Sequence, residues 1–173
     1  RFMEHCARSS RSRSDSGKPG PKPFRLPGHP PRYLPDRIVR NEHIHLKLVP
    51  DFKDRSIAGH ATLTVVPIVS REVTELELDQ RELIIHEVTV KQSDSVVECQ
   101  YRLTDDKLVI NFKRGRGLVP QMSYDIVIGY ETSPRWGLHF VGPDADHPER
   151  PEQLWTLSQE ENSRYWFPCF AHP

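Results

Sequence analysis

Histidines are the residues in this sequence with the clearest potential for metal chemistry, and there are nine of them. His43 and His45 stand two apart, which places both side chains on one face of a β-strand, and imidazole is a common ligand of divalent metals. A complete site would need His60 or His86 to converge on that pair. No cysteine or carboxylate stands at ligand spacing, and one strand supplies only two ligands. We therefore interpret these histidines as polar residues on the wet face of a sheet and expect no metal site.

Catalytic sequence motifs are absent from the 173 residues. There is no HExxH, no GxSxG, no glycine-rich phosphate loop and no CxxC pair. Cys6, Cys99 and Cys169 are widely separated, which argues against a disulfide framework and favours a reducing, cytoplasmic location. We expect no catalytic residue in this chain and no activity from the chain alone.

The last forty residues carry the most specific pattern. They read SPRWGLHFVG at 133–142, an acidic, proline-rich loop at 144–153, and LWTLSQEENSRYWFPCFAHP at 154–173. This segment resembles the end of the N-terminal β-domain of the M1 zinc aminopeptidases, which are gluzincin metallopeptidases. The residues that match the family pattern are Gly137, Leu138, Thr156, Arg164, Phe167, Pro168, Cys169, Phe170 and Pro173. Together with LELDQRELIIHEVTV at 76–90 and SIAGHATLTV at 56–65, the likeness covers about residues 38–173.

The resemblance implies a β-domain that binds substrate and packs against a catalytic domain as its partner. The family's zinc belongs to that catalytic domain, so we expect no cofactor in this chain. In the family the β-domain contributes one acidic or amide side chain, eight positions before the Phe of Phe-Pro-Cys, and that position is Gln159. Its side-chain oxygen would accept a hydrogen bond from the terminal ammonium of a peptide substrate.

The other matching residues have structural interpretations. Phe167 and Phe170 are expected to be core or interface anchors, and Cys169 an inert, buried thiol. Arg164 has Glu160 and Glu161 as possible ion-pair partners.

Three positions depart from the family pattern. Leu157 replaces the usual Gln, Gln159 the commoner Glu, and Ala171 the Asp that follows Phe-Pro-Cys-x. The alternative interpretation is a free-standing or degenerate β-sandwich that serves as a protein-interaction module. An isolated peptidase domain should expose the apolar face that packs on its catalytic domain, whereas a free-standing module should not.

Period-two patterns predict an all-β fold for residues 38–173. Ile44, Leu46 and Leu48 alternate with polar residues, and similar short, β-branched runs recur about every ten residues. The predicted strands cover 43–48, 56–69, 73–79, 83–90, 96–103, 107–112 and 123–131, with a tight turn at 114–117. No stretch offers three turns of helical periodicity. These features predict an antiparallel β-sandwich or a saddle-shaped pair of curved sheets.

Residues 1–37 differ from the rest in composition. They hold nine Lys/Arg against three acidic residues, and 6–36 contains seven prolines. We interpret this segment as a disordered basic arm rather than as a nucleic-acid-binding patch. No run of about 18 apolar residues is present, which argues against a membrane segment.

Overall fold

The computed structural model describes residues 36–159 and 161–170, in which ten β-strands and one 3-10 turn succeed one another. The first five strands are β1 (Val39–Asp51), β2 (Ser56–Pro67), β3 (Glu75–Asp79), β4 (Ile84–Gln92) and β5 (Ser95–Val97). The others are β6 (Cys99–Leu103), β7 (Lys107–Phe112), β8 (Tyr124–Thr132), β9 (Leu138–Val141) and β10 (Gln153–Thr156), followed by the turn η1 (Asn162–Tyr165). The predicted all-β class is confirmed.

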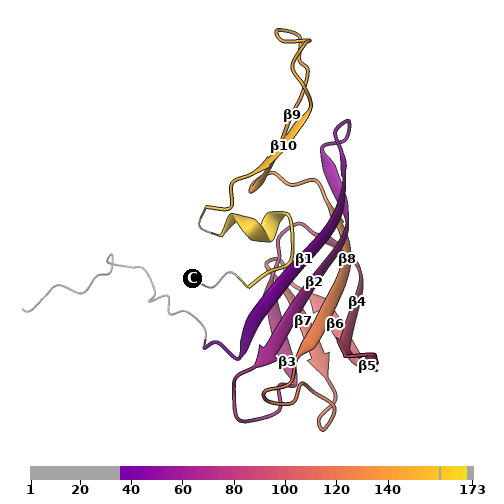
Figure 1. Ribbon diagram of the computed structural model, residues 1–173, viewed down its shortest axis with the longest axis vertical. Coiled ribbons are helices and arrows are strands. Elements are labelled where there is room, and N and C mark those ends of the chain that lie inside the picture. The colour runs from indigo at the N-terminus through magenta and orange to yellow at the C-terminus, as the bar shows by residue number, and fades with distance from the viewer. Residues whose placement is uncertain (1–35, 160, 171–173) are drawn as a thin grey trace, which may run out of the picture. The chain divides into compact units, whose positions relative to one another are not determined.

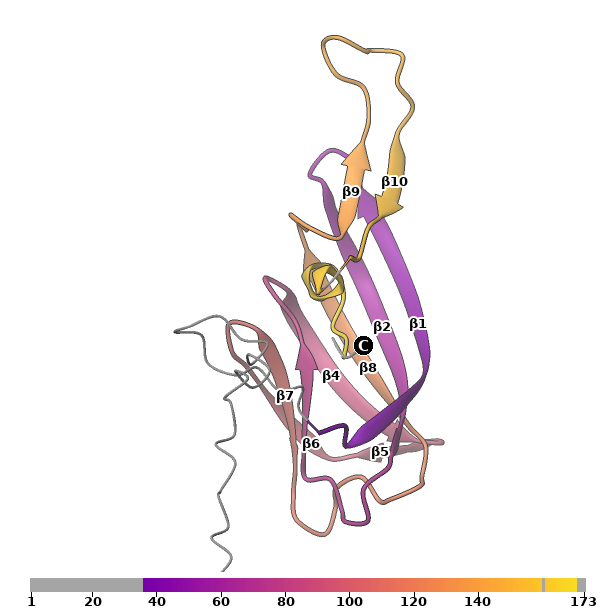
Figure 2. The same ribbon diagram turned by 90° about the vertical axis from the view of Figure 1, so that its left-hand side faces the viewer.

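The strands form three antiparallel sheets. The largest has the order β1-β2-β8-β4-β5, the second β3-β7-β6, and the third is the two-stranded ribbon of β9 and β10. Figures 1 and 2 show the first two as twisted layers that face each other at one end of the domain. All the strand pairs within the sheets are antiparallel.

The core lies between the two larger sheets. Alternate residues of β2 and β8 point inward, and Leu63, Ile126 and Ile128 have no exposed surface. Leu78 and Ile110 cover them from the smaller sheet. The period-two pattern of the sequence thus corresponds to one buried and one solvent-exposed face of each sheet, because side chains alternate across a strand.

One predicted strand is wrong. Residues 96–103 form two strands, because β5 pairs with β4 in the large sheet whereas β6 pairs with β7 in the smaller one. The chain changes sheets at Glu98, and the period-two pattern continues through that corner without marking it. Strand β10 was not predicted, because its four residues are exposed and follow a proline-rich loop.

Other predictions agree with the structure to within a few residues, and β7 matches its predicted range. The turn at 114–117 lies between β7 and β8, where Gly115 adopts a left-handed backbone with φ of 80°. The predicted arm at 1–37 falls almost wholly on residues outside the described part of the chain. Within 36–159 and 161–170, no helix is long and apolar enough to cross a membrane.

Candidate functional site

The C-terminal turn η1 and the residues after it are tied to the inner face of β8. The buried hydroxyl of Tyr130 donates a hydrogen bond to the carbonyl of Trp166 at 2.8 Å. Thr132, also buried, places its hydroxyl 3.4 Å from the carbonyl of Tyr165. Both views show η1 over this part of the large sheet (Figures 1 and 2). The segment that resembles the family motif is therefore an integral part of the domain.

Gly137 is the point where the chain leading into β9 meets this turn. Its φ is +81°, and a β-carbon at this position would stand 2.4 Å from the carbonyl oxygen of Asn162 and 2.8 Å from the Trp166 ring. Both the backbone conformation and the space therefore require glycine. The next residue, Leu138, is buried in the core. The two motif residues thus have packing roles.

The Phe-Pro-Cys-Phe segment forms part of the domain's interior. Phe167, Pro168 and Cys169 are buried, and Phe170 is half-buried. Cys169 extends the smaller sheet, because it exchanges two backbone hydrogen bonds with Asp79, at 2.7 and 3.0 Å. Burial raises the pKa of the Cys169 thiol to about 12, with a contribution from the nearby Asp79 charge. The thiol is protonated at neutral pH, as expected of a structural cysteine.

Arg164 links η1 to the loop between β3 and β4. Its carbonyl accepts a hydrogen bond from the Arg81 amide at 2.8 Å, and its guanidinium forms an ion pair with Glu161. Of the two expected partners, Glu160 lies outside the described residues. Among the described residues the buried Nε of Arg164 has no hydrogen-bond partner.

Gln159 lies just before η1 and is exposed. Its carbonyl accepts a hydrogen bond from the Asn162 amide at 3.3 Å. On its other side, the Ser158 hydroxyl accepts a hydrogen bond from the indole N–H of Trp166 at 3.1 Å. The predicted substrate-binding residue is thus exposed, in a segment held by a backbone contact on one side and a side-chain contact on the other.

Exposed apolar side chains gather around the β9–β10 ribbon. Trp136, Leu157 and Trp155 are 56%, 50% and 46% exposed. The Trp155 ring stacks on His139 with centroids 4.2 Å apart. The Phe140 ring packs edge-on against Phe52, which follows β1, with centroids 5.5 Å apart. Trp155 and Leu157 stand two apart and therefore share one face of the ribbon, and we call these two side chains the ribbon surface. It adjoins Gln159 in the chain.

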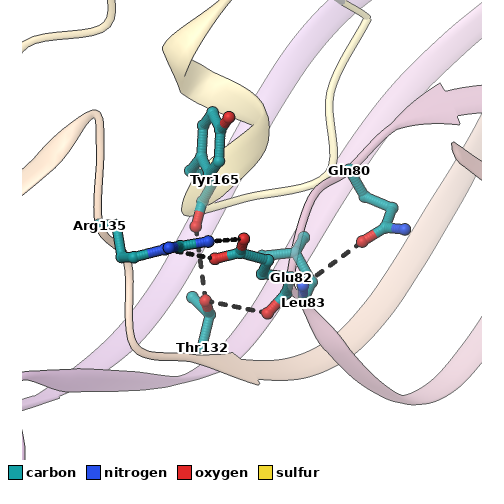
Figure 3. Close-up of polar contacts among 6 residues, drawn as sticks. All are labelled: Gln80, Glu82, Leu83, Thr132, Arg135 and Tyr165. Carbon is teal, nitrogen blue, oxygen red and sulfur yellow. Dashed lines mark hydrogen bonds and ion pairs between the residues drawn. The ribbon is translucent and has the colours of Figure 1, made fainter. Parts of the chain in front are cut away.

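A network of polar contacts fixes the β3–β4 loop beside η1 (Figure 3). The buried Gln80 amide donates to the carbonyl of Thr104 at 2.8 Å, and its oxygen lies 3.4 Å from the Leu83 amide. The Arg135 guanidinium donates twice to the carboxylate of Glu82, once at 3.0 Å from Nε. The Glu82–Arg135 contact cannot be predicted from the sequence, because no spacing signal connects residues 53 positions apart.

The Glu82–Arg135 pair predicts a pH-dependent stability. The hydrogen-bonded guanidinium of Arg135 lowers the pKa of Glu82 below its usual 4.5. A lowered folded-state pKa stabilises the fold above the unfolded-state pKa, and this stabilisation is lost as pH falls through the folded-state value. Glu82→Gln should therefore lower the urea midpoint slightly at pH 7 and hardly at all near pH 3. The exposed Glu77→Gln serves as control, and a Glu82→Gln effect that is the same at both pH values would contradict the assignment.

A well-formed cavity lies elsewhere, between the start of β1 and the edge strand β3. It has a volume of about 470 Å³, and Ile38, Leu76 and Phe170 contribute to its wall together with charged side chains. Gln159 does not line it. The cavity therefore does not mark the predicted substrate site.

The four candidate histidines, His43, His45, His60 and His86, do not converge into a metal site in the part of the chain that the structure describes. Nε2 of His60 lies 3.2 Å from a carboxylate oxygen of Glu87, and both side chains lie next to Gly129, which has no side chain. Nε2 of His86 lies 3.6 Å from a carboxylate oxygen of Glu131. Among the described residues, no three His, Cys, Asp or Glu side chains are grouped as metal ligands. These residues do not fit a zinc ion, so no zinc-dependent step is assigned to them.

Comparison with known proteins agrees with this fold and motif. The sequence profile of the peptidase M1 N-terminal domain matches residues 40–173, and the chain belongs to this family as an N-terminal domain. Family zinc resides in the catalytic domain, and the 173 residues contain no HExxH.

Solved structures share the fold. Leukotriene A4 hydrolase from Saccharomyces cerevisiae matches with a TM-score of 0.59 and 20% identity, over 78% of this chain and 21% of that one. The same yeast enzyme in complex with bestatin matches with a TM-score of 0.59 and 19% identity, over 82% and 23%. A mutant M1 zinc metallopeptidase from Deinococcus radiodurans, bound to a Tyr-Ser-Ala substrate, gives 0.57 and 21%, over 78% and 30%. This chain spans about a fifth to a third of the length of these proteins.

Proposed function

We propose that this chain is the substrate-binding and scaffold domain of an M1-type zinc aminopeptidase, which removes N-terminal residues from peptides. In this proposal the domain comprises residues 38–173. The partner is a metallopeptidase domain that supplies the zinc, and the ligand is the N-terminus of a peptide. Neither a nucleic acid nor a membrane is needed for this function.

The ribbon surface is the observation that supports a partner domain most directly. A two-stranded ribbon is marginally stable in water, and β9 and β10 have four residues each. One part of it packs on Phe52 through Phe140, while Trp155 and Leu157 remain about half exposed. Large exposed apolar patches mark interaction sites, because covering them removes apolar area from water. This favours the interpretation as a domain that packs against a partner domain, rather than the interpretation as a free-standing module.

Gln159 supports the substrate-binding part of the proposal. It is exposed at the border of the ribbon surface, where a covering domain would create a cleft beside it. An ammonium group has three donors and no acceptor, so it needs acceptor oxygens, and the Gln159 amide oxygen is one. A neutral amide gives a weaker bond than a carboxylate.

Association with a metallopeptidase domain of the family tests the partner assignment. The 173-residue chain should bind that domain, and the double variant Trp155→Ser/Leu157→Ser should weaken the complex at least tenfold, because two apolar side chains lose their buried contacts. Titration calorimetry measures the change, and Val96→Ser on the distant β5 serves as an exposed apolar control. Equal affinity of the double variant and the control would refute the ribbon surface as the docking site.

A further inference from the structure

The indole of Trp166 forms a side-chain bridge to the segment that carries Gln159. Its Nε1–H donates to the Ser158 hydroxyl at 3.1 Å, and Ser158 is bonded covalently to Gln159. Ser158 is exposed, whereas Trp166 is half-buried and packs its ring on Phe167 with centroids 4.5 Å apart. The bridge thus connects an exposed segment to the core.

The backbone of Trp166 is itself fixed. Its carbonyl accepts the hydroxyl of Tyr130 at 2.8 Å, and its amide donates to the Ser163 carbonyl at 3.1 Å. Tyr130 lies near the end of β8, the middle strand of the large sheet, and is 1% exposed, so its hydroxyl is held by surrounding packing. A continuous set of contacts therefore runs from β8 through Trp166 to Ser158.

Backbone hydrogen bonds hold Leu157 and Gln159, whereas the Ser158 side chain between them is held by Trp166. The Leu157 amide donates to the Gly137 carbonyl at 2.9 Å, which extends the β9–β10 pairing by one residue. The Gln159 carbonyl accepts from Asn162 at 3.3 Å, a long hydrogen bond. Between these contacts, the Ser158 hydroxyl is tied to the indole of Trp166.

We propose that Trp166 is a positioning residue, which acts through Ser158 to hold Gln159 in the orientation that binds a substrate ammonium. This inference rests on the proposed function. A binding group placed in advance avoids the ordering cost that a mobile loop would incur at each binding event. Trp166 does not contact the substrate in this scheme, and Tyr130 supports it from the sheet.

Two variants remove the bridge from opposite sides. Trp166→Phe keeps an aromatic ring in the core but lacks the indole N–H, and Ser158→Ala removes the acceptor without altering the core. In the polypeptide that joins this domain to its metallopeptidase domain, each should lower kcat/KM for free-amine peptides about three- to tenfold, the range for one neutral hydrogen bond. Ser95→Ala on β5 is the matched control and should leave kcat/KM unchanged.

Coupling to Gln159 separates positioning from general stability. In a Gln159→Ala background, Ser158→Ala should cause no further loss, because the group being positioned is gone. Full additivity of the two losses would overturn the proposal. If Gln159→Ala lowers kcat/KM while Ser158→Ala and Trp166→Phe leave it unchanged, the positioning role is likewise wrong and the proposed function stands.

Backbone order in the 173-residue chain gives a test that needs no catalysis. The ¹⁵N order parameter of the Gln159 amide should fall in both Ser158→Ala and Trp166→Phe, while that of Ile126 in the core stays the same. An unchanged order parameter at Gln159 in both variants would overturn the positioning role even if Gln159→Ala proved inactive. A fall in order with no effect of Gln159→Ala on kinetics would support the positioning of Gln159 and remove the ammonium-binding function.

Discussion

Gly137→Ala is expected to destabilise the domain by about 3 kcal/mol and to loosen the C-terminal turn. A left-handed backbone costs a non-glycine residue roughly 1 kcal/mol or more. The new β-carbon would also stand 2.4 Å from the Asn162 carbonyl oxygen and 2.8 Å from the Trp166 ring, and overpacking of this kind costs about 1–3 kcal/mol. Urea unfolding at pH 7 measures the loss, with unchanged slope m.

Gly115→Ala is the matched control for this experiment. Gly115 has nearly the same φ, +80° against +81°, but nothing lies within 4 Å of its added β-carbon. Its loss should therefore reflect backbone strain alone, about 1 kcal/mol. Equal losses for the two variants would show that close packing of η1 on Gly137 is not the cause.

Hydrogen exchange locates the effect of Gly137→Ala. The amides of Trp166 and Phe167 both donate to the Ser163 carbonyl, at 3.1 Å each, and should exchange faster in the variant. Amides of β2 and β8, which pair along the middle of the large sheet, should change only with global stability. Uniform acceleration over the whole domain would contradict a local detachment of the turn.

Strands could be predicted because alternation is a local property. The runs around Leu63 and Ile126 place apolar side chains at every second position, and a strand puts those on one face. The sheet to which a strand belongs is not local, which is why residues 96–103 were assigned to a single strand. The alternation is the same on both sides of Glu98, and only the partners β4 and β7 differ.

The motif positions followed from a family resemblance, but their contacts did not. Gly137 and Arg164 were recognised as motif residues, whereas the partners of Trp166 depend on tertiary packing. Tyr130 is one of several apolar or aromatic residues in β8. Nothing in its spacing indicates that its hydroxyl donates a hydrogen bond to the Trp166 carbonyl. Side-chain bridges between segments 36 positions apart require the folded arrangement.

Substitution of Gln159 is expected to have the largest effect on function. In a polypeptide that joins this domain to its metallopeptidase domain, Gln159→Ala should lower kcat/KM on free-amine peptides about 10- to 100-fold. A hydrogen bond to a charged group contributes about 1.5–3 kcal/mol, and its loss also lets the scissile bond move away from the reacting groups. Because Gln159 is exposed, the stability of the domain should remain unchanged.

Introducing a negative charge at the same position sharpens this test. Gln159→Glu should preserve or raise kcat/KM on free-amine peptides, because a carboxylate makes a charge-assisted bond to the ammonium. N-acetylated peptides lack that charge and should gain nothing. The exposed Gln153→Ala on β10 controls for loss of a surface amide close by in the chain. Unchanged kcat/KM of Gln159→Ala on free-amine peptides would leave Gln159 an ordinary surface residue and this domain a scaffold without a direct role in recognition.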